Sequence, residues 1–277
     1  NLNSTFKISK KLEFNLISNA SYRKQKAPGT LGSETDAVSG EVKRDFDINP
    51  YSYSMNTSRT LSPNEYYTRN YAPFNIFNEL ENNYMKLGVT DFRLTGRLTY
   101  KPISKLELSI LAGMQSTTTS QEHYITDNSN QAQAYRAMPT STIREKNPLL
   151  YTDPDNIYAL PISILPNGGI YERTDRNMFK WDMRASISYN DVFNDDHIVN
   201  FYGGMETNSV DRHSTWFRGW GLQYTMGEVP NYAYQVFKKG QEDNSEYYNL
   251  TNKQERSAAF FGNATYSYQG KYTINGT

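Results

Sequence analysis

Residues Leu106 to Gln115 read Leu-Glu-Leu-Ser-Ile-Leu-Ala-Gly-Met-Gln, and this stretch decides the fold. Leu106, Leu108 and Ile110 alternate with Glu107 and Ser109, and the apolar series continues through Ala112 and Met114. A period of two predicts a β-strand with one apolar face and one mostly polar face, and no helical period fits it.

The same alternation recurs along the chain. It is clear at 180–189, where Trp181, Met183 and Ile187 alternate with charged residues and serines, and at 92–100. Weaker versions occur at 2–8, 12–22, 199–205 and 258–268, and a short one at 272–274. We therefore predict eight antiparallel strands. The full strands have about ten residues or more, which is long enough for a tilted strand to cross a hydrocarbon layer.

The connections between these strands alternate strictly between short and long. We expect short turns near 10–11, 101–105, 190–196 and 269–270, and long loops at about 24–85, 116–178 and 208–253. Soluble antiparallel folds rarely contain loops this long without structure of their own. Membrane barrels have short turns at one rim and long extracellular loops at the other. The pattern therefore predicts an antiparallel transmembrane β-barrel segment.

The composition agrees with this prediction and excludes several classes. The 277 residues include 29 Lys+Arg and 29 Asp+Glu, so there is no basic field to hold nucleic acid. The mean hydropathy is -0.77, and no apolar run is long enough for a membrane-spanning helix. There is no cysteine, which excludes disulfides and thiolate chemistry. Aromatic residues nevertheless reach 14%, with 23 tyrosines, as expected for a barrel with amphipathic rings at the membrane interfaces.

The alternation assigns side chains to the two faces of the predicted wall. The residues expected to face lipid are Leu106, Leu108, Ile110, Trp181, Met183, Ile187 and Tyr189. The residues expected to face the lumen are Arg93, Arg97, Glu107, Lys180, Asp182, Arg184 and Glu206. So many charges favour a wide, wet lumen, because a narrow interior would impose large desolvation costs on them.

No enzyme, cofactor or metal site is predicted. His123, His197 and His213 lie far apart in sequence and lack the spacing of zinc ligands. The acidic stretch 153–156 lacks the spacing of a calcium loop. No serine occurs in a Gly-x-Ser-x-Gly motif, and no Gly-Lys-Ser/Thr sequence follows Gly168-Gly169.

The strongest candidate for a contact site lies in the third predicted loop. It consists of aromatic residues around one arginine, namely Trp216, Phe217, Arg218, Trp220, Tyr224, Tyr232 and Tyr234. Such rings suit stacking on sugars, gripping peptide side chains or burial against a partner protein. They equally suit packing of the loop onto itself, and the sequence leaves these readings open.

Four patches carry a resemblance to a known family. They are Arg184–Asn190, Asp196–Glu206, Phe261–Tyr272 and, in the second predicted loop, Asn147–Tyr151. These patches resemble barrel segments of the SusC-like (RagA-like) TonB-dependent outer-membrane transporters of Bacteroidota. The resemblance implies a 22-stranded barrel that imports oligosaccharides or peptides across the outer membrane.

The resemblance also implies partners. These are a plug inside the barrel, a segment that contacts the TonB complex, a SusD-like surface lipoprotein and the lipid bilayer. The chain begins at Asn1 and ends at Thr277 without a plug or TonB-contacting segment. We therefore expect about a third of a larger barrel, whose open edges need the rest of their own barrel because unpaired backbone groups are costly in lipid.

Two alternatives remain. A secreted β-rich carbohydrate-binding or adhesion module would show the same alternation between core and solvent, and would bind its ligand through the loop with Trp216 and Trp220. A small passive outer-membrane barrel of eight strands would satisfy its own edges. The rings near predicted turns, such as Tyr22, Tyr189 and Tyr268, favour a membrane belt over a sandwich core.

Overall fold

The main element of the fold is one large antiparallel sheet. The computed structural model describes residues 2–29, 34–35, 42–43, 46–156, 158–245 and 247–277. The spatial order is β1-β2-β7-β8-β9-β10-β12-β13, and β11 pairs with β10. The strands of this sheet are β1 (Leu2–Lys7), β2 (Leu12–Pro28), β7 (Asn83–Ile103), β8 (Leu106–Ile125), β9 (Gly169–Phe193), β10 (His197–Gln223), β11 (Val229–Pro230), β12 (Tyr248–Tyr268) and β13 (Tyr272–Gly276). Neighbours in the sheet follow one another along the chain, and the sheet stays open.

Smaller elements lie in the connections. Two short hairpins pair β3 (Glu34–Thr35) with β4 (Val42–Lys43) and β5 (Tyr67–Arg69) with β6 (Ala72–Phe74). The helices are α1 (Pro50–Asn56), α2 (Ile76–Asn82), α3 (Asn130–Ala134), α4 (Ser141–Lys146), α5 (Tyr234–Glu242) and the 3₁₀ turn η1 (Tyr224–Met226). Among the described residues, none of the helices has the length and apolar character needed to cross a membrane.

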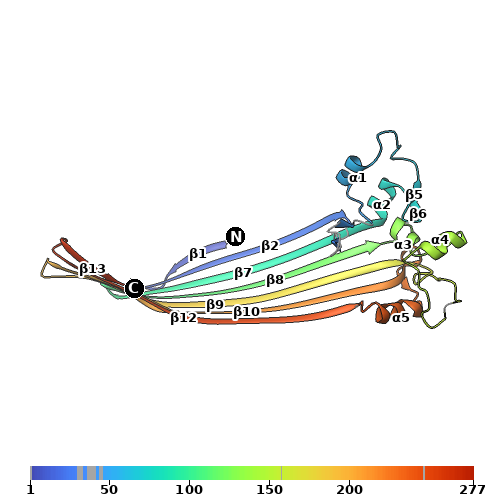
Figure 1. Ribbon diagram of the computed structural model, residues 1–277. Coiled ribbons are helices and arrows are strands. Elements are labelled where there is room, and N and C mark those ends of the chain that lie inside the picture. Colours follow the sequence, from blue (N-terminus) through green and yellow to red (C-terminus); the bar gives the residue numbers. More distant parts are fainter. Residues whose placement is uncertain (1, 30–33, 36–41, 44–45, 157, 246) are drawn as a thin grey trace.

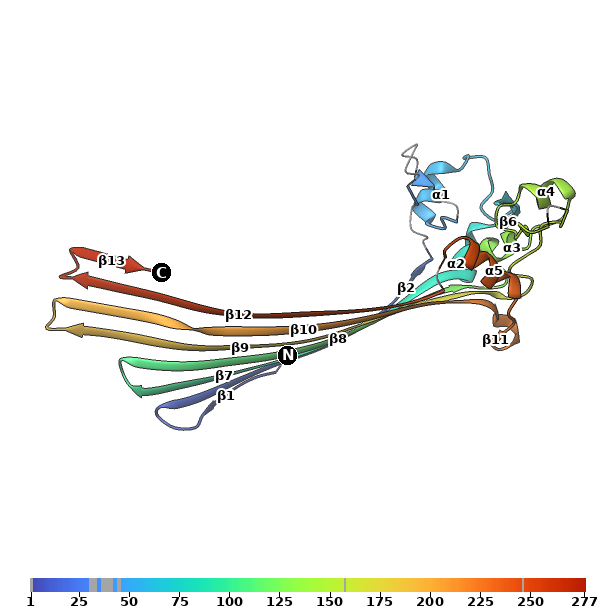
Figure 2. The ribbon, with the colours of Figure 1, turned by 60° about the horizontal axis from the view of Figure 1, so that its bottom comes forward.

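Short turns and long connections separate to opposite ends of the sheet. Figure 1 shows a long curved layer with every helix gathered at one end, and Figure 2 shows only tight hairpins at the other. Asn194 and Asp195 have φ of 50° and 60°, and Gln269 and Gly270 have φ of 50° and 67°. Positive φ at both central residues is the conformation that matches a hairpin turn to the twist of its strands. These turn residues therefore favour the hairpins that join β9 to β10 and β12 to β13.

The strands run much further than the alternation predicts. β8 continues to Ile125, β9 begins at Gly169 and β10 continues to Gln223, so parts of the predicted loops 116–178 and 208–253 are strand. β2 likewise extends to Pro28, and β7 begins at Asn83. These outer halves carry polar residues on both faces and so give no period-two signal, while backbone pairing continues unbroken through Asn83↔Ile125.

Residues directly opposite one another across the strands form rows that define the two faces. One row runs Leu98, Ile110, Ala185, Met205 and Phe260. The adjacent row, on the other face, runs Arg97, Leu111, Arg184, Glu206 and Ala259. We call the first face the apolar face and the second the polar face. The residues predicted to face lipid and those predicted to face the lumen lie on these opposite faces, as the alternation requires.

The apolar face is not covered by protein among the described residues. Trp181, Ile110 and Phe260 are 41%, 46% and 84% exposed. The buried core lies instead among the connections at the helix-bearing end, where Ile125, Ala132, Leu165 and Ile170 form one cluster and Ile48, Phe74 and Ile76 another. An uncovered apolar face of this size is a site of contact with another apolar phase or partner.

Hydrogen bonds join the first long connection to the second. The Asn130 side chain donates to the backbone oxygens of Arg69 and Ala72 at 2.7 and 3.1 Å, and its backbone N–H donates to Glu79 Oε1 at 2.8 Å. Glu79 is 1% exposed, and its second oxygen has no hydrogen-bond partner. Burial raises the pKa of Glu79 to about 7, although the bonds from Asn130 and Asn78 oppose the rise.

Candidate functional site

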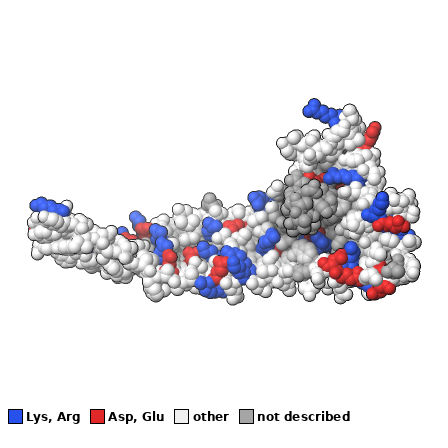
Figure 3. All heavy atoms as spheres, in the orientation of Figure 1, with Lys and Arg blue, Asp and Glu red and all other residues white. Residues whose placement is uncertain are grey.

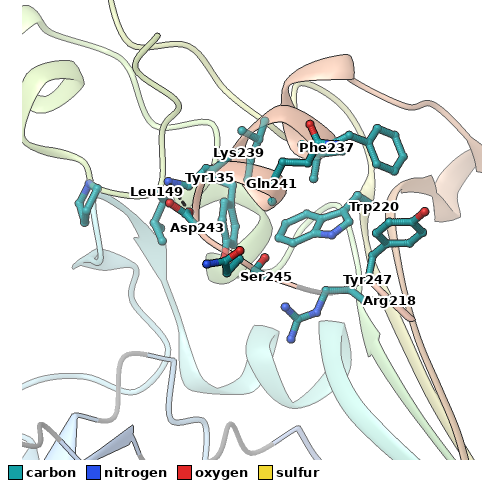
Figure 4. Close-up of a pocket in the computed structure, with 15 residues that line it drawn as sticks. Tyr135, Leu149, Arg218, Trp220, Phe237, Lys239, Gln241, Asp243, Ser245 and Tyr247 are labelled. Carbon is teal, nitrogen blue, oxygen red and sulfur yellow. Dashed lines mark ion pairs between the residues drawn. The ribbon is translucent and has the colours of Figure 1, made fainter. Parts of the chain in front are cut away.

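A cavity of about 770 Å³ lies at the helix-bearing end of the sheet. The end of β10, the connection between β8 and β9, and α5 enclose it (Figure 4). Its lining residues are Tyr135, Pro148, Leu149, Ile164, Arg218, Trp220, Val236, Phe237, Lys239, Gly240, Gln241, Asp243, Asn244, Ser245 and Tyr247. Apolar side chains such as Leu149, Ile164 and Val236 share the wall with polar ones such as Gln241, Asn244 and Ser245, and cavities of this size are the usual form of ligand sites.

β10 places Arg218 and Trp220 on the polar face of the sheet. Both are an even number of residues from Glu206, and side chains alternate along a strand. The Trp220 ring packs edge-on against Tyr135 with centroids 5.2 Å apart, and it also packs against the core cluster that contains Ile125. This packing fixes the indole before any ligand arrives.

The charged groups at the cavity are paired within the protein. Arg218 Nε donates to Glu172 Oε1 at 2.6 Å, and the guanidinium lies 5.2 Å and 5.9 Å from the rings of Trp216 and Trp220. Lys239 pairs with Asp243 at 3.1 Å across one turn. The cavity therefore combines a mixed polar and apolar wall with neutralised charges, which suits an uncharged group that has both apolar and hydrogen-bonding parts.

A second ion pair fixes α5 against the connection before β9. Lys238 Nζ binds Asp153 Oδ1 at 2.9 Å and lies 5.5 Å from the Tyr151 ring, whose hydroxyl donates to Glu242 at 3.2 Å. The hydrogen bond from Lys238 lowers the pKa of Asp153, and the same bond raises the pKa of Lys238. The acidic stretch 153–156 thus serves as a docking point for α5.

The predicted aromatic group is only partly brought together. Trp216, Phe217, Arg218 and Trp220 lie in β10 and not in a loop, because β10 continues through Gln223. Arg218 and Trp220 line the cavity, whereas Phe217 points to the opposite face and is 43% exposed. Tyr232 and Tyr234 are 63% and 71% exposed and are absent from the lining.

Tyr224 is held by hydrogen bonds within the protein and does not line the cavity. Its hydroxyl donates to the backbone oxygen of Ile170 at 2.9 Å, and its N–H donates to Asp127 at 3.0 Å. Burial raises the pKa of Tyr224. It therefore anchors η1 to the start of β9, the packing role that the sequence left open.

Sequence reasoning missed most of the cavity wall. Tyr135, Leu149 and Ile164 come from the second long connection, Phe237 lies in α5 and Tyr247 follows that helix. Phe237 and Tyr247, whose ring centroids are 5.6 Å apart, could have been added to the predicted aromatic group because both lie close to it in sequence. The residues of the second connection have no local pattern that links them to β10.

The histidines lie apart in space. His123 Nε2 contacts Asn83 Oδ1, His197 Nδ1 contacts the Tyr266 hydroxyl and His213 Nδ1 contacts Asn252 Oδ1, each at 2.6 Å. Over the part of the chain that the structure describes, no three His, Asp or Glu residues are placed to hold a metal ion.

The polar face carries both paired and unpaired charges. Arg184 binds Glu206 through two nitrogens at 2.6 and 3.1 Å, and Lys101 binds Glu107 at 3.0 Å. Lys180 and Asp182 are 3.9 Å apart. Arg93 and Arg97 form no ion pair with any described residue. Figure 3 shows charges along the middle and the helix-bearing end of the molecule, and a mostly uncharged turn end, on the side that it displays.

Comparisons with known proteins show the fold. No protein-family model and no curated protein matches the chain. A chain in the structure of the RagAB peptide transporter matches with a TM-score of 0.59 and 13% identity, over 99% of this chain and 26% of that one. The RagAB peptide importer in its closed-closed state matches with a TM-score of 0.57, at the same identity and coverage. This chain thus spans about a quarter of the length of these transporter chains. The predicted fold class, an all-β antiparallel segment of a larger barrel, is confirmed.

Proposed function

We propose that the chain forms part of the wall of an outer-membrane importer. The observation that carries the proposal is the uncovered apolar face, in a sheet whose long connections all emerge at one end and whose fold matches a peptide transporter. In β8 the apolar residues run from Leu106 to Met114, and in β9 from Phe179 to Tyr189. Membrane strands need about 9–11 residues to cross the hydrocarbon layer, so the belt has the required height.

The polar face would line the lumen. Arg93, Arg97, Lys180 and Arg184 would be hydrated there or contact a plug, together with Glu107, Asp182 and Glu206. The edge strands β1 and β13 do not pair with each other among the described residues, which argues against a small closed barrel of eight strands. In lipid these edges need partner strands, which the rest of the same barrel would supply.

The cavity beneath α5 would contact cargo or a SusD-like lipoprotein at the extracellular end. Its walls favour a peptide as cargo over an oligosaccharide, because aliphatic side chains such as Leu149, Ile164 and Val236 stand beside amides that could bind a peptide backbone, and its charges are paired. Tyr135 packs edge-on against the Trp220 ring and the Arg218 guanidinium lies 5.9 Å from its centre, so these neighbours compete with a sugar for the ring. Transport through the pore would draw energy from TonB, and the wall itself would perform no catalysis.

Uptake by cells that carry the full-length protein tests this proposal. Cells that lack the gene should lose import of fluorescent oligopeptides, and the wild-type gene should restore it. A Trp220→Ala variant should restore less import than a Phe217→Ala variant, because Phe217 points away from the cavity. Purification of the protein from the soluble fraction without detergent, or unchanged uptake in cells lacking the gene, would overturn the proposal.

A further inference from the structure

A groove of about 400 Å³ lies on the apolar face, on the side of the belt toward the helix-bearing end. Thr118 in β8, Asn177 and Phe179 in β9, His213 in β10, and Asn252 and Gln254 in β12 line it. Four adjacent strands thus contribute to one hollow on the face that the proposed function places against lipid.

The rows across the sheet fix the height of this groove. The row through Phe92, Ser116 and Phe179 is the last that contains large apolar side chains of the belt. That row also contains Asp211 and Gln254. The next row on the same face is Tyr22, Thr90, Thr118, Asn177, His213 and Asn252. From Thr90 to Asn252 its side chains are uncharged hydrogen-bonding groups, and under the proposed function this row lies where lipid headgroups meet the acyl chains.

Apart from charged side chains that are paired within the protein, the polar groups of the groove are amides, hydroxyls and the His213 imidazole. His213 Nδ1 contacts Asn252 Oδ1 at 2.6 Å, and His213 Nε2 contacts Thr215 Oγ1 at 3.1 Å, so the imidazole is fixed in the row. The side chains of Asn177 and Gln254 each offer both donors and acceptors. Such mixed donors and acceptors match the hydroxyl groups of a sugar. Phe179, which is 46% exposed, offers an apolar surface for the C–H face of a sugar ring.

Asp211, Arg212 and Lys253 also line the groove, and their charges are already matched within the protein. Arg212 and Lys253 both pair with Glu255, at 2.8 and 3.1 Å. Arg256 Nη2 donates to Asp211 Oδ1 at 2.7 Å, and Arg256 Nη1 donates to the backbone oxygens of Val210 and Glu255 at 3.2 and 3.0 Å. A phosphate group binds most strongly to arginine or lysine side chains that have no other ionic partner. This arrangement favours a neutral saccharide over a phosphate as the group that is recognised.

We propose that this groove binds the saccharide headgroup of a glycolipid in the leaflet that surrounds the barrel. The inference rests on the proposed function, because it requires the apolar face to contact the membrane. The acyl chains of the lipid would lie along the belt below Phe179, and its first sugar would lie against Thr118, Asn177 and Asn252.

Retention of lipopolysaccharide tests the inference on the full-length protein in nanodiscs of phosphatidylethanolamine with a small fraction of lipopolysaccharide. An Asn177→Leu, Asn252→Leu double variant removes both amides with little change in volume. A Gln121→Leu variant, on the opposite face of β8 and three residues beyond Thr118, is the control. We expect native mass spectrometry to show about tenfold weaker lipopolysaccharide binding in the double variant, equivalent to about 1.4 kcal/mol, and none of this loss in the control.

Equal binding by the wild type and the double variant would overturn the inference. Enzymatic removal of the phosphates from the lipopolysaccharide should leave binding nearly unchanged, and loss of binding on dephosphorylation would show that phosphate is recognised instead. Fluorescence quenching by brominated lipid shows whether only the groove assignment is wrong or whether the proposed function is wrong as well. If Trp181 is quenched but the variants bind glycolipid equally, only the groove assignment is wrong, whereas an unquenched Trp181 contradicts the lipid-facing wall itself.

Discussion

Arg218 and Glu172 face each other across β10 and β9, with Arg218 Nε 2.6 Å from Glu172 Oε1, at the wall of the cavity beneath α5. The guanidinium is about one-third exposed and the carboxylate less so. The pair neutralises the arginine that would otherwise place a free positive charge beside Trp220. If the cavity binds cargo as proposed, apolar contacts would set its selection as long as the pair is intact.

Removing the carboxylate should change that selection. In a Glu172→Gln variant the Arg218 guanidinium is left free to bind an anionic group, and a charge-assisted hydrogen bond contributes about 1.5–3 kcal/mol. We expect acidic oligopeptides to compete at least about tenfold better for uptake than they do with the wild type. Glu122→Gln is the control, because Glu122 lies on the opposite face. The same peptide preference in both variants would show that Arg218 does not meet cargo.

A charge on the apolar face should impair assembly far more than a charge on the polar face. Ile110→Arg places a guanidinium in the belt, where arginine costs roughly 2–4 kcal/mol near the bilayer midplane. Ser109→Arg, one residue earlier, points to the opposite face and should assemble almost normally. Urea unfolding in bilayers, followed by heat-modifiable gel mobility, measures the difference. Equal losses in the two variants would contradict the assignment of faces.

Two glycines near the cavity should respond differently to the same substitution. Gly221 has a φ of 78°, and a Cβ there would collide with the Asn231 carbonyl oxygen. Gly227 has a φ of 81°, but a Cβ there would meet no atom within 4 Å. Gly227→Ala should cost only the roughly 1–2 kcal/mol of a left-handed alanine. Gly221→Ala should in addition separate β10 from β11 and make the connection before β12 sensitive to trypsin, and similar cleavage of both variants would refute this.

The contact between α2 and α3 should weaken as pH rises. Glu79 has a native pKa of about 7 and an ordinary value of 4.5, so between these values the native state holds a proton that the unfolded state lacks. The stabilisation is present below about pH 4.5, falls as pH rises to about 7 and then stays low. It amounts to about 3 kcal/mol at most.

Hydrogen exchange at the Asn130 amide measures this effect. Its protection factor should be higher at pH 5 than at pH 8, and Glu79→Gln should remove the difference because glutamine mimics the protonated acid. Glu81→Gln, at an exposed position of the same helix, should behave like the wild type. A pH dependence that survives in Glu79→Gln would assign the effect to another group.

The sequence predicts the fold where the two faces of a strand meet different surroundings. Residues 106–114 and 181–189 alternate because one face is apolar and the other polar, and these ranges lie inside β8 and β9 as expected. Beyond them, residues such as Thr117, Thr118 and Thr119 are polar on both faces. The hydropathy of these residues does not alternate and so does not indicate a strand, although the backbone pairing between strands continues.

The candidate site was predictable only in part, for a related reason. Trp220 and Arg218 stand out by composition, but Tyr135 and Leu149 join them through the folding of a connection far away in sequence. Side chains that meet through long-range packing leave no local period. That the cavity binds cargo, and that the polar face lines a lumen, remain predictions.

A cysteine scan of β8 from Leu106 to Gln115 tests the lipid-facing wall most directly, because this chain contains no other cysteine. Each position would carry a spin label in the full-length protein in bilayers, and accessibility to oxygen and to a water-soluble nickel complex would be compared. We predict that oxygen accessibility is high at 106, 108, 110, 112 and 114 and low between them, with the nickel complex in antiphase. Accessibility to the nickel complex at all ten positions, or to neither reagent at the even ones, would contradict a sheet with one face in lipid.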